Sequence, residues 1–148
     1  MKVRVILAGI LAGLVLNIGE ALLHGVIFAD AAETAMKNLG HEIAGSGLDT
    51  AHLVVITFIQ GLLGMLLYSA VQPRWQSGLG TAIRVGLVMW VLSAVYSCIY
   101  LTSGFAGLIP RHLAWGPVAV ELLLYPLAII AGSLVIKDGG FADQSATM

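Results

Sequence analysis

The stretch VILAGILAGLVLNIGEALLHGVIFA (residues 5–29) is apolar for longer than the roughly 20 residues that a helix needs to cross the hydrocarbon core of a membrane. It lacks the period-two alternation of a transmembrane barrel strand. Its polar exceptions are Asn17, Glu20 and His24. The stretch therefore predicts a transmembrane helix that carries polar groups.

Three further stretches have the same character, and no repeat or linker separates them. The four predicted spans are Val5–Ala29, Ala51–Val71, Leu79–Ser103 and Leu113–Ile136. The fold class that they predict is all-α, an integral membrane four-helix transmembrane bundle. We expect one four-span domain over residues 1–137, followed by a polar cytoplasmic tail over residues 138–148.

The composition of the chain supports this class. Of 148 residues, 59% are hydrophobic and 10% are charged, against roughly 25% charged in an ordinary soluble domain. With a net charge of only -1, this argues against a soluble enzyme, a disordered chain and a nucleic-acid binder. The single cysteine, Cys98, excludes an intramolecular disulfide and a thiolate metal cluster, and we expect it to be a small core residue.

The first span has one alternative interpretation, a secretory signal, because residues 1–4 are basic and residues 29–31 resemble a cleavage site. A signal has an apolar core of about 7–15 residues, shorter than this span. A disposable segment would also not need Asn17, Glu20 and His24. We therefore expect the first span to remain uncleaved.

The basic residues predict the orientation. One side of the membrane collects Lys2, Arg4, Arg74, Arg84 and Lys137. The other side has only Lys37 and Arg111. The positive-inside rule then predicts a cell (inner) membrane protein with both termini in the cytoplasm.

The first outer loop contains a predicted helix, Ala31–Leu39, which ends before Gly40. Asp30 and Glu33 have the spacing of a capping box, with Asp in place of the usual Ser or Thr. We expect this short outer helix to be interfacial and to lie on the rim of the bundle, with a functional lid as the less favoured alternative.

Each span has one face of small and polar residues. On the first, Gly9 and Gly13 form a GxxxG pattern that allows close helix approach, and the face then turns polar. The predicted faces are Gly9, Gly13, Asn17, Glu20 and His24; Thr57, Gln60, Gly61, Gly64 and Tyr68; Trp90, Ser93, Ser97 and Tyr100; and Pro117, Glu121, Tyr125, Ala128 and Gly132.

These faces meet at one predicted depth. Glu20, Gln60, Ser93 and Glu121 each lie eight to ten residues from the outer end of their span. At 1.5 Å per residue, that places them about 12–15 Å below the outer boundary, near the middle of the membrane. The sequence therefore predicts a mid-membrane polar pocket.

The two buried glutamates suggest a function for this pocket. Polar side chains inside a bundle often only bond one helix to another, and Asn17, Thr57, Ser93 and Ser97 fit that role. Glutamate is a costly choice for such a role, and intramembrane carboxylates are functional by default. We therefore expect the protein to bind or translocate a proton, a cation or a small polar solute. The candidate site residues are Glu20, Glu121, Asn17, His24, Gln60, Tyr125, Ser93 and Ser97.

Two alternatives remain open. The first is a non-catalytic structural or assembly subunit of a larger membrane complex, as a homo-oligomer or with partner membrane subunits. The second is a metal- or haem-binding role, with His24, Glu20 and Glu121 as weak candidate ligands; we expect the rim histidines His52 and His112 to make interfacial hydrogen bonds instead. No cofactor is strongly indicated, and the absence of catalytic motifs argues against an enzyme.

The run GEALLHGVIF (residues 19–28), followed by MKNLG (residues 36–40), resembles small four-span bacterial membrane proteins. That resemblance implies the four-span architecture and brings no function with it. The lipid bilayer is the partner that the composition itself implies.

Overall fold

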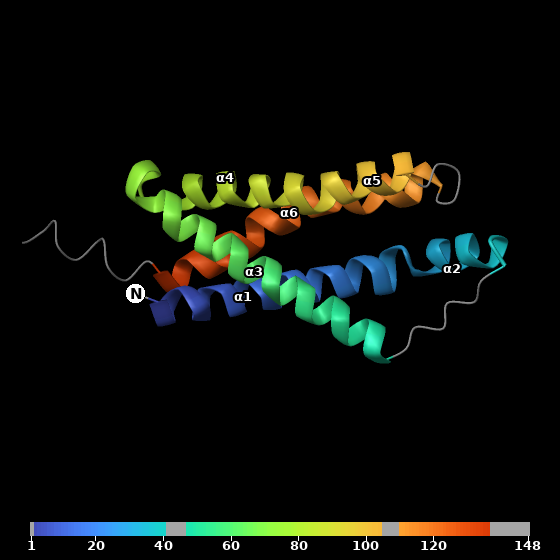
Figure 1. The fold of residues 1–148 in the computed structure, drawn as a ribbon, viewed down its shortest axis with the longest axis horizontal. Helices are drawn as coiled ribbons and strands as arrows, with labels where there is room; N and C mark the ends of the chain where they lie inside the picture. The colour runs from blue at the N-terminus through green and yellow to red at the C-terminus, as the bar shows by residue number, and fades with distance from the viewer. Residues whose placement is uncertain (1, 41–46, 105–109, 137–148) are drawn as a thin grey trace, which may run out of the picture.

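The computed structural model describes residues 2–40, 47–104 and 110–136, which are almost entirely helical and include no strand. Four helical stretches pack together as a bundle (Figure 1). Each is long and apolar enough to cross a membrane: Val3–Ile27, Gly47–Trp75, Leu79–Gly104 and Arg111–Ile136. The predicted all-α four-helix bundle is confirmed. The predicted tail, together with His41, Glu42 and Lys137, lies outside the described residues.

Two of the four long helices contain a wide π-helical turn. The first consists of α1 (Lys2–Leu22) and the π turn η1 (Leu23–Ile27), and the third of α4 (Leu79–Trp90), the π turn η2 (Val91–Val95) and α5 (Tyr96–Gly104). The other two are α3 (Gly47–Trp75) and α6 (Arg111–Ile136), and the short helix α2 (Ala29–Asn38) follows η1. Both π turns are nearer the α2 end of the bundle than its other end, and π turns are frequent at functional sites.

The connection between α3 and α4 is short and covers residues 76–78. Pro73 lies inside the last turn of α3 without ending the helix. A proline removes only one helical hydrogen bond, and α3 ends instead after Trp75, where Gln76 takes a φ of 65°. The Thr81 hydroxyl then donates to the carbonyl oxygens of Trp75 and Gln76, at 3.1 and 2.8 Å.

Glycines allow α1 and α3 to touch backbone to backbone. A Cβ added at Gly61 would lie 2.6 Å from the Cα of Gly13 and 2.7 Å from the carbonyl oxygen of Gly9. Such distances leave no space for a side chain. The prediction that the GxxxG pattern permits close approach is confirmed.

The helix α6 packs between α1 and α4, and glycines again allow the close approach. A Cβ added at Gly132 would lie 2.7 Å from the carbonyl oxygen of Ala8 on α1. On the other side, Gly86 of α4 packs directly against Pro126. Small residues thus bring α6 close to both of its neighbours.

The two halves of the bundle differ in packing. We call the half away from α2 the closed half, residues 5–16, 61–71, 79–90 and 125–136. We call the half next to α2 the open half, residues 17–27, 47–60, 91–104 and 111–124. Of the six largest fully buried side chains, only Leu23 belongs to the open half. There, α5 packs against α6 but makes no substantial contact with α3.

The short helix α2 departs from its prediction in two ways. Its N-cap is Phe28, and Asp30 lies inside the first turn without a capping hydrogen bond, so the predicted capping box is absent. The helix also extends beyond the end of α1 instead of lying across the rim (Figure 1). None of its residues is buried, and the side chain of its N-cap residue, Phe28, packs against Gly116 near the start of α6.

The predicted face of the third span is wrong beyond residue 93. Ser97 and Tyr100 are exposed, whereas Ala94 and Cys98 are buried. The π turn η2 explains the difference, because its wider turn rotates every following residue relative to a regular α-helix. The expectation that Cys98 is a small core residue is confirmed.

Candidate functional site

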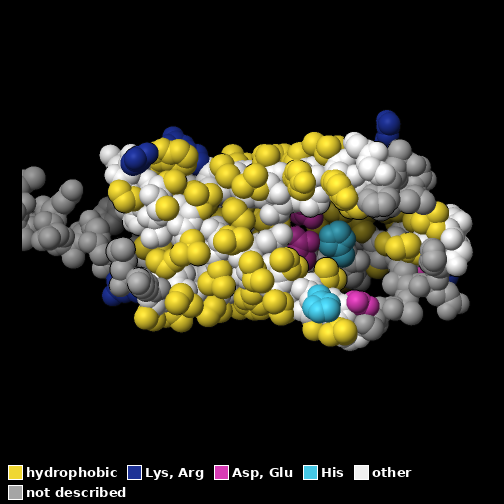
Figure 2. Space-filling model, viewed as in Figure 1, with side chains coloured by type: hydrophobic (Ala, Val, Ile, Leu, Met, Phe, Trp, Pro, Cys, Tyr) yellow, Lys and Arg dark blue, Asp and Glu magenta, His cyan; other side chains and the backbone are white. Residues whose placement is uncertain are grey.

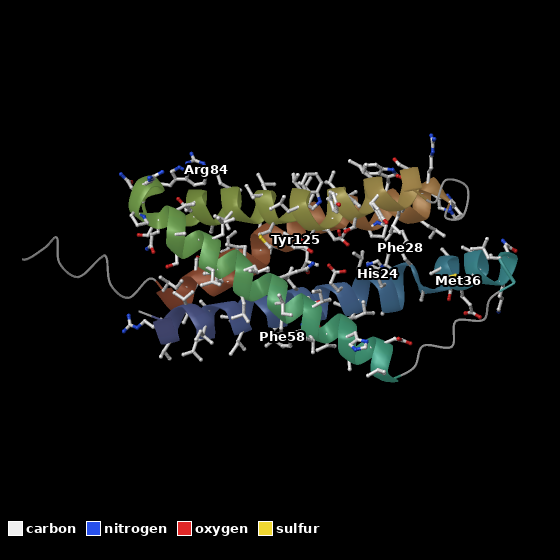
Figure 3. All side chains as sticks on the ribbon, in the orientation of Figure 1. His24, Phe28, Met36, Phe58, Arg84 and Tyr125 are labelled. Carbon is white, nitrogen blue, oxygen red and sulfur yellow. The ribbon has the colours of Figure 1, made fainter. Side chains whose placement is uncertain are left out.

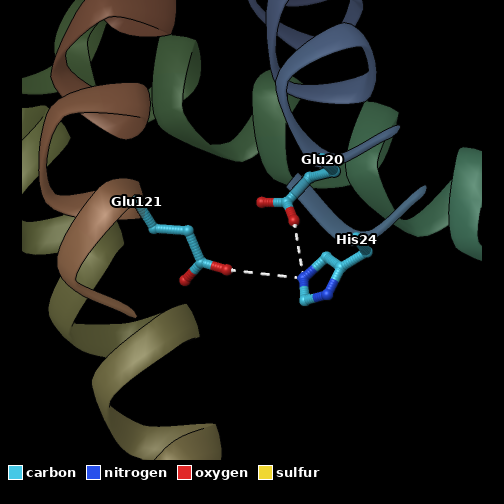
Figure 4. Close-up of side chains that lie close together, drawn as sticks. All are labelled: Glu20, His24 and Glu121. Atoms are coloured by element: carbon cyan, nitrogen blue, oxygen red, sulfur yellow. Dashed lines mark ion pairs between the residues drawn. The ribbon is translucent and has the colours of Figure 1, made fainter. Parts of the chain in front are cut away.

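Three ionisable side chains converge in the open half of the bundle (Figure 4). The Nε2 atom of His24 lies 3.3 Å from Oε2 of Glu20 and 3.8 Å from Oε1 of Glu121. One ligand atom from each of the three residues falls within 4.8 Å of the other two. We call this group the Glu–His–Glu cluster.

Local sequence and helix packing together create the cluster. Glu20 and His24 are four residues apart on one helix, so their side chains lie one above the other. Glu121 comes from α6, which runs alongside α1. Gly19, next to Glu20, has no side chain, and the side chain of Leu124 of α6 occupies that space beside the carboxylates.

The three side chains of the cluster differ in their exposure. The side chain of Glu121 is 11% exposed, that of Glu20 is 23% exposed, and that of His24 is 56% exposed. Figure 2 shows acidic and histidine side chains in a hollow of the molecular face between α1 with α3 and α4 with α5. His24 projects from η1 at the same place in Figure 3. The cluster is therefore accessible from the side of the bundle where α3 and α5 diverge.

The charges of the cluster favour a bound cation. Two carboxylates face one imidazole nitrogen on helices that are apolar enough to cross a membrane, and a negative charge is costly there unless it is paired. A proton, the protonated imidazole itself or a metal ion would each supply the compensating positive charge. The arrangement can therefore hold a proton or a metal ion between α1 and α6.

A second polar group lies deeper and links three helices. The hydroxyl of Tyr125 donates a hydrogen bond of 3.1 Å to Oε1 of Gln60, and Ser93 on η2 is a second hydrogen-bonding neighbour of that hydroxyl. Tyr125 is buried, and its ring is seen pointing into the bundle in Figure 3. This group joins α6 to α3 and to the third long helix.

The other predicted site residues are placed apart from the cluster. The amide of Asn17 donates to the carbonyl oxygens of Gly13, at 2.9 Å, and Val54, at 3.4 Å, and so connects α1 with α3. Ser97 is exposed on α5, outside both polar groups. The residues predicted to form one pocket therefore belong to separate groups. These are the Glu–His–Glu cluster, the hydrogen-bonded group around Tyr125, and the hydrogen bond from Asn17 to α3.

Two hydrogen bonds that the sequence did not predict attach the third long helix to α6. The indole Nε1 of Trp90 donates to the carbonyl oxygen of Val118 at 2.8 Å, and the Cys98 thiol donates to that of Ala114 at 3.3 Å. Both carbonyls belong to the N-terminal part of α6, on either side of Pro117. A carbonyl oxygen has two lone pairs, so each can accept a side-chain hydrogen bond in addition to a helical one. The rim histidines His52 and His112 are exposed and do not join the cluster.

Comparison of the chain with protein-family models, with curated proteins and with solved structures gave no match. The functional interpretation therefore rests on the geometry and the chemistry of the Glu–His–Glu cluster.

Proposed function

We propose that the protein is a four-span membrane protein that binds a cation, either a proton or a metal ion, at Glu20, His24 and Glu121. The observation that carries the proposal is the convergence of these three side chains within 4.8 Å, inside helices apolar enough to cross a membrane. Ionisable residues in such helices are rare because they are costly, and they mark ion or proton sites.

We propose that the α2 end of the bundle lies on the outer side of a cell membrane, so that both termini are cytoplasmic. Arg4, Arg74 and Arg84 lie towards the opposite end, and Figure 2 shows most of the Lys and Arg side chains there. Only Lys37 and Arg111 belong to the α2 end of the described chain. This asymmetry follows the positive-inside rule.

The position of the cluster favours exchange with the outer side. His24 is three residues and Glu20 seven residues before Ile27, where the first membrane helix ends. These separations correspond to depths of about 5 and 10 Å, and the ten residues from Arg111 to Glu121 correspond to about 15 Å. The cluster therefore extends from the mid-membrane level that the sequence suggested towards the α2 end.

Binding with exchange on one side agrees better with the packing than open conduction does. Ala8, Met65 and Ala128 are fully buried in the closed half, and apolar contacts surround them. An ion crossing the bundle would require this half to open. We therefore place binding first, and translocation would demand a second conformation.

The test is an infrared titration of the carboxyl groups in nanodiscs, comparing the native chain with Glu20→Gln and Glu121→Gln. We expect a carboxyl band that titrates, responds to added cations and changes in both variants. Glu33→Gln, which alters an exposed carboxylate on α2, serves as the control and should leave that band unchanged. Carboxyl bands that stay protonated and insensitive to cations up to about pH 9 would contradict the proposal. They would favour interhelical hydrogen bonding in a structural subunit.

A further inference from the structure

The Glu–His–Glu cluster has the dimensions of a transition-metal site. A tetrahedral ion with ligands at about 2.0–2.1 Å holds those ligands about 3.4 Å apart. The two distances from Nε2 of His24, 3.3 and 3.8 Å, bracket that separation, and the ligand atoms of Glu20 and Glu121 lie within 4.8 Å of each other. On this geometry, and on the proposed cation-binding function, we infer that the site takes a divalent transition-metal ion of the zinc type, with one coordination position left open.

The donor atoms favour this class of ion over calcium or magnesium. The imidazole nitrogen of His24 is the atom that both carboxylates approach, so an ion between the three residues is necessarily bound by nitrogen. Calcium and magnesium select all-oxygen shells, calcium with six to eight ligands. Imidazole with carboxylate suits zinc, iron and their neighbours.

The charge of the site matches a divalent ion. When His24 binds as a neutral imidazole, Glu20 and Glu121 contribute two negative charges, which one divalent ion neutralises. A monovalent ion would leave one negative charge unpaired next to apolar helices, which is costly in such surroundings. The apolar environment therefore selects for two positive charges.

The number of ligands leaves room for a further molecule. In the described part of the chain, three residues offer ligands at this point. Three protein ligands plus one water or substrate is the arrangement of zinc sites that exchange ligands. His24 is the most exposed of the three ligands and projects from η1 (Figure 3). A small molecule would therefore reach the open position from the side where α3 and α5 diverge.

The experiment uses the full chain with any affinity tag removed, stripped with a chelator and reconstituted in nanodiscs. Zn²⁺ binding is measured by calorimetry, and Co²⁺ is added as a spectroscopic probe. We expect one Zn²⁺ per chain, strong visible d–d absorption typical of four-coordinate Co²⁺, loss of that absorption when Zn²⁺ is added, and no competition by Ca²⁺ or Mg²⁺.

Variants assign the ligands. Glu20→Gln, His24→Gln and Glu121→Gln should each weaken Zn²⁺ binding by at least the 10- to 100-fold that losing an outer-shell partner typically costs. His52→Gln and Glu33→Gln remove the same groups outside the cluster and should bind Zn²⁺ as the native chain does. Circular dichroism of each variant shows whether the bundle has folded, and folded variants alone enter the comparison.

The possible outcomes separate this inference from the proposed function. Unchanged Zn²⁺ affinity in the three folded cluster variants overturns the metal site. Effective competition by Ca²⁺, with His24→Gln binding normally, overturns the transition-metal class. If the carboxylates titrate but no metal binds, the metal inference is wrong and proton binding stands. If neither occurs, both proposals are wrong.

Discussion

The closed half and the open half of the bundle are built from the same apolar helices, yet different contacts hold them. In the closed half, Gly13 and Gly61 bring two backbones together and large side chains fill the remaining space. In the open half, hydrogen bonds such as that from the Cys98 thiol to the Ala114 carbonyl attach one helix to another.

This difference shows how a polar site can exist in an apolar bundle. The backbone contacts of the closed half fix the positions of α1, α3 and α6, so the open half does not need tight packing of its own. It can therefore accommodate the two π turns and the divergence of α3 from α5. The ionisable cluster lies at that divergence, where exchange with the surroundings is possible.

The largest expected effect comes from breaking the closed half. Gly61→Leu places a side chain where the backbone of Gly13 lies, and backbone cannot move aside as a side chain can. We expect the free energy of unfolding to fall by about 3 kcal/mol or more, because overpacking a core typically costs about 1–3 kcal/mol and here the obstacle is backbone. Denaturation in detergent, followed by circular dichroism, measures it.

Gly80→Leu is the matched control for that experiment. Gly80 belongs to a helix of the same half, and a Cβ added there meets no atom within 4 Å. We expect it to cost far less than Gly61→Leu. Equal losses in the two variants would mean that the glycine contact between α1 and α3 is not what holds the closed half.

Much of the fold follows from the sequence because it depends on length and periodicity. The four spans are each long and apolar, and the faces of α1, α3 and α6 have regular helical spacing, so Gly61 and Glu121 fall on buried or inward sides as expected. The i,i+4 spacing of Glu20 and His24 likewise places them together without any knowledge of tertiary contacts.

The sequence could not reveal the features that depend on irregular backbone or on the arrangement of neighbours. The π turn η2 carries no proline or glycine that would mark it, and it rotates Ser97 and Tyr100 away from the expected face. Residues predicted at the same depth also do not all contact one another. Gln60, for example, accepts a hydrogen bond from Tyr125 and is not part of the Glu–His–Glu cluster. Which polar groups meet is decided by how α6 crosses its neighbours.

A smaller effect is expected where the two halves meet. Tyr125→Phe keeps the buried ring and removes the hydroxyl that bonds Gln60. An interhelical hydrogen bond of this kind contributes about 0.6–1.7 kcal/mol in a membrane bundle, so we expect a loss in that range. A double-mutant cycle with Gln60→Leu isolates the pair. Strictly additive losses in the cycle would mean that the two side chains do not stabilise each other.

The smallest effect is expected in α2, which lies outside both halves. Nζ of Lys37 lies 2.6 Å from Oε1 of Glu33, and this contact holds the pKa of Glu33 below its ordinary value and that of Lys37 above its own. The contribution of the pair to α2 is therefore lost when the pH falls through the lowered pKa of Glu33. It is lost again when the pH rises through the raised pKa of Lys37.

Because both side chains are exposed, that contribution is small and local. Carbon-13 NMR of the Glu33 carboxyl should show the lowered pKa, and Lys37→Gln should return it towards the ordinary value. Glu33→Gln should leave the free energy of unfolding of the bundle unchanged, because α2 buries no residue against it. A measurable loss of bundle stability in Glu33→Gln would show instead that α2 supports the open half.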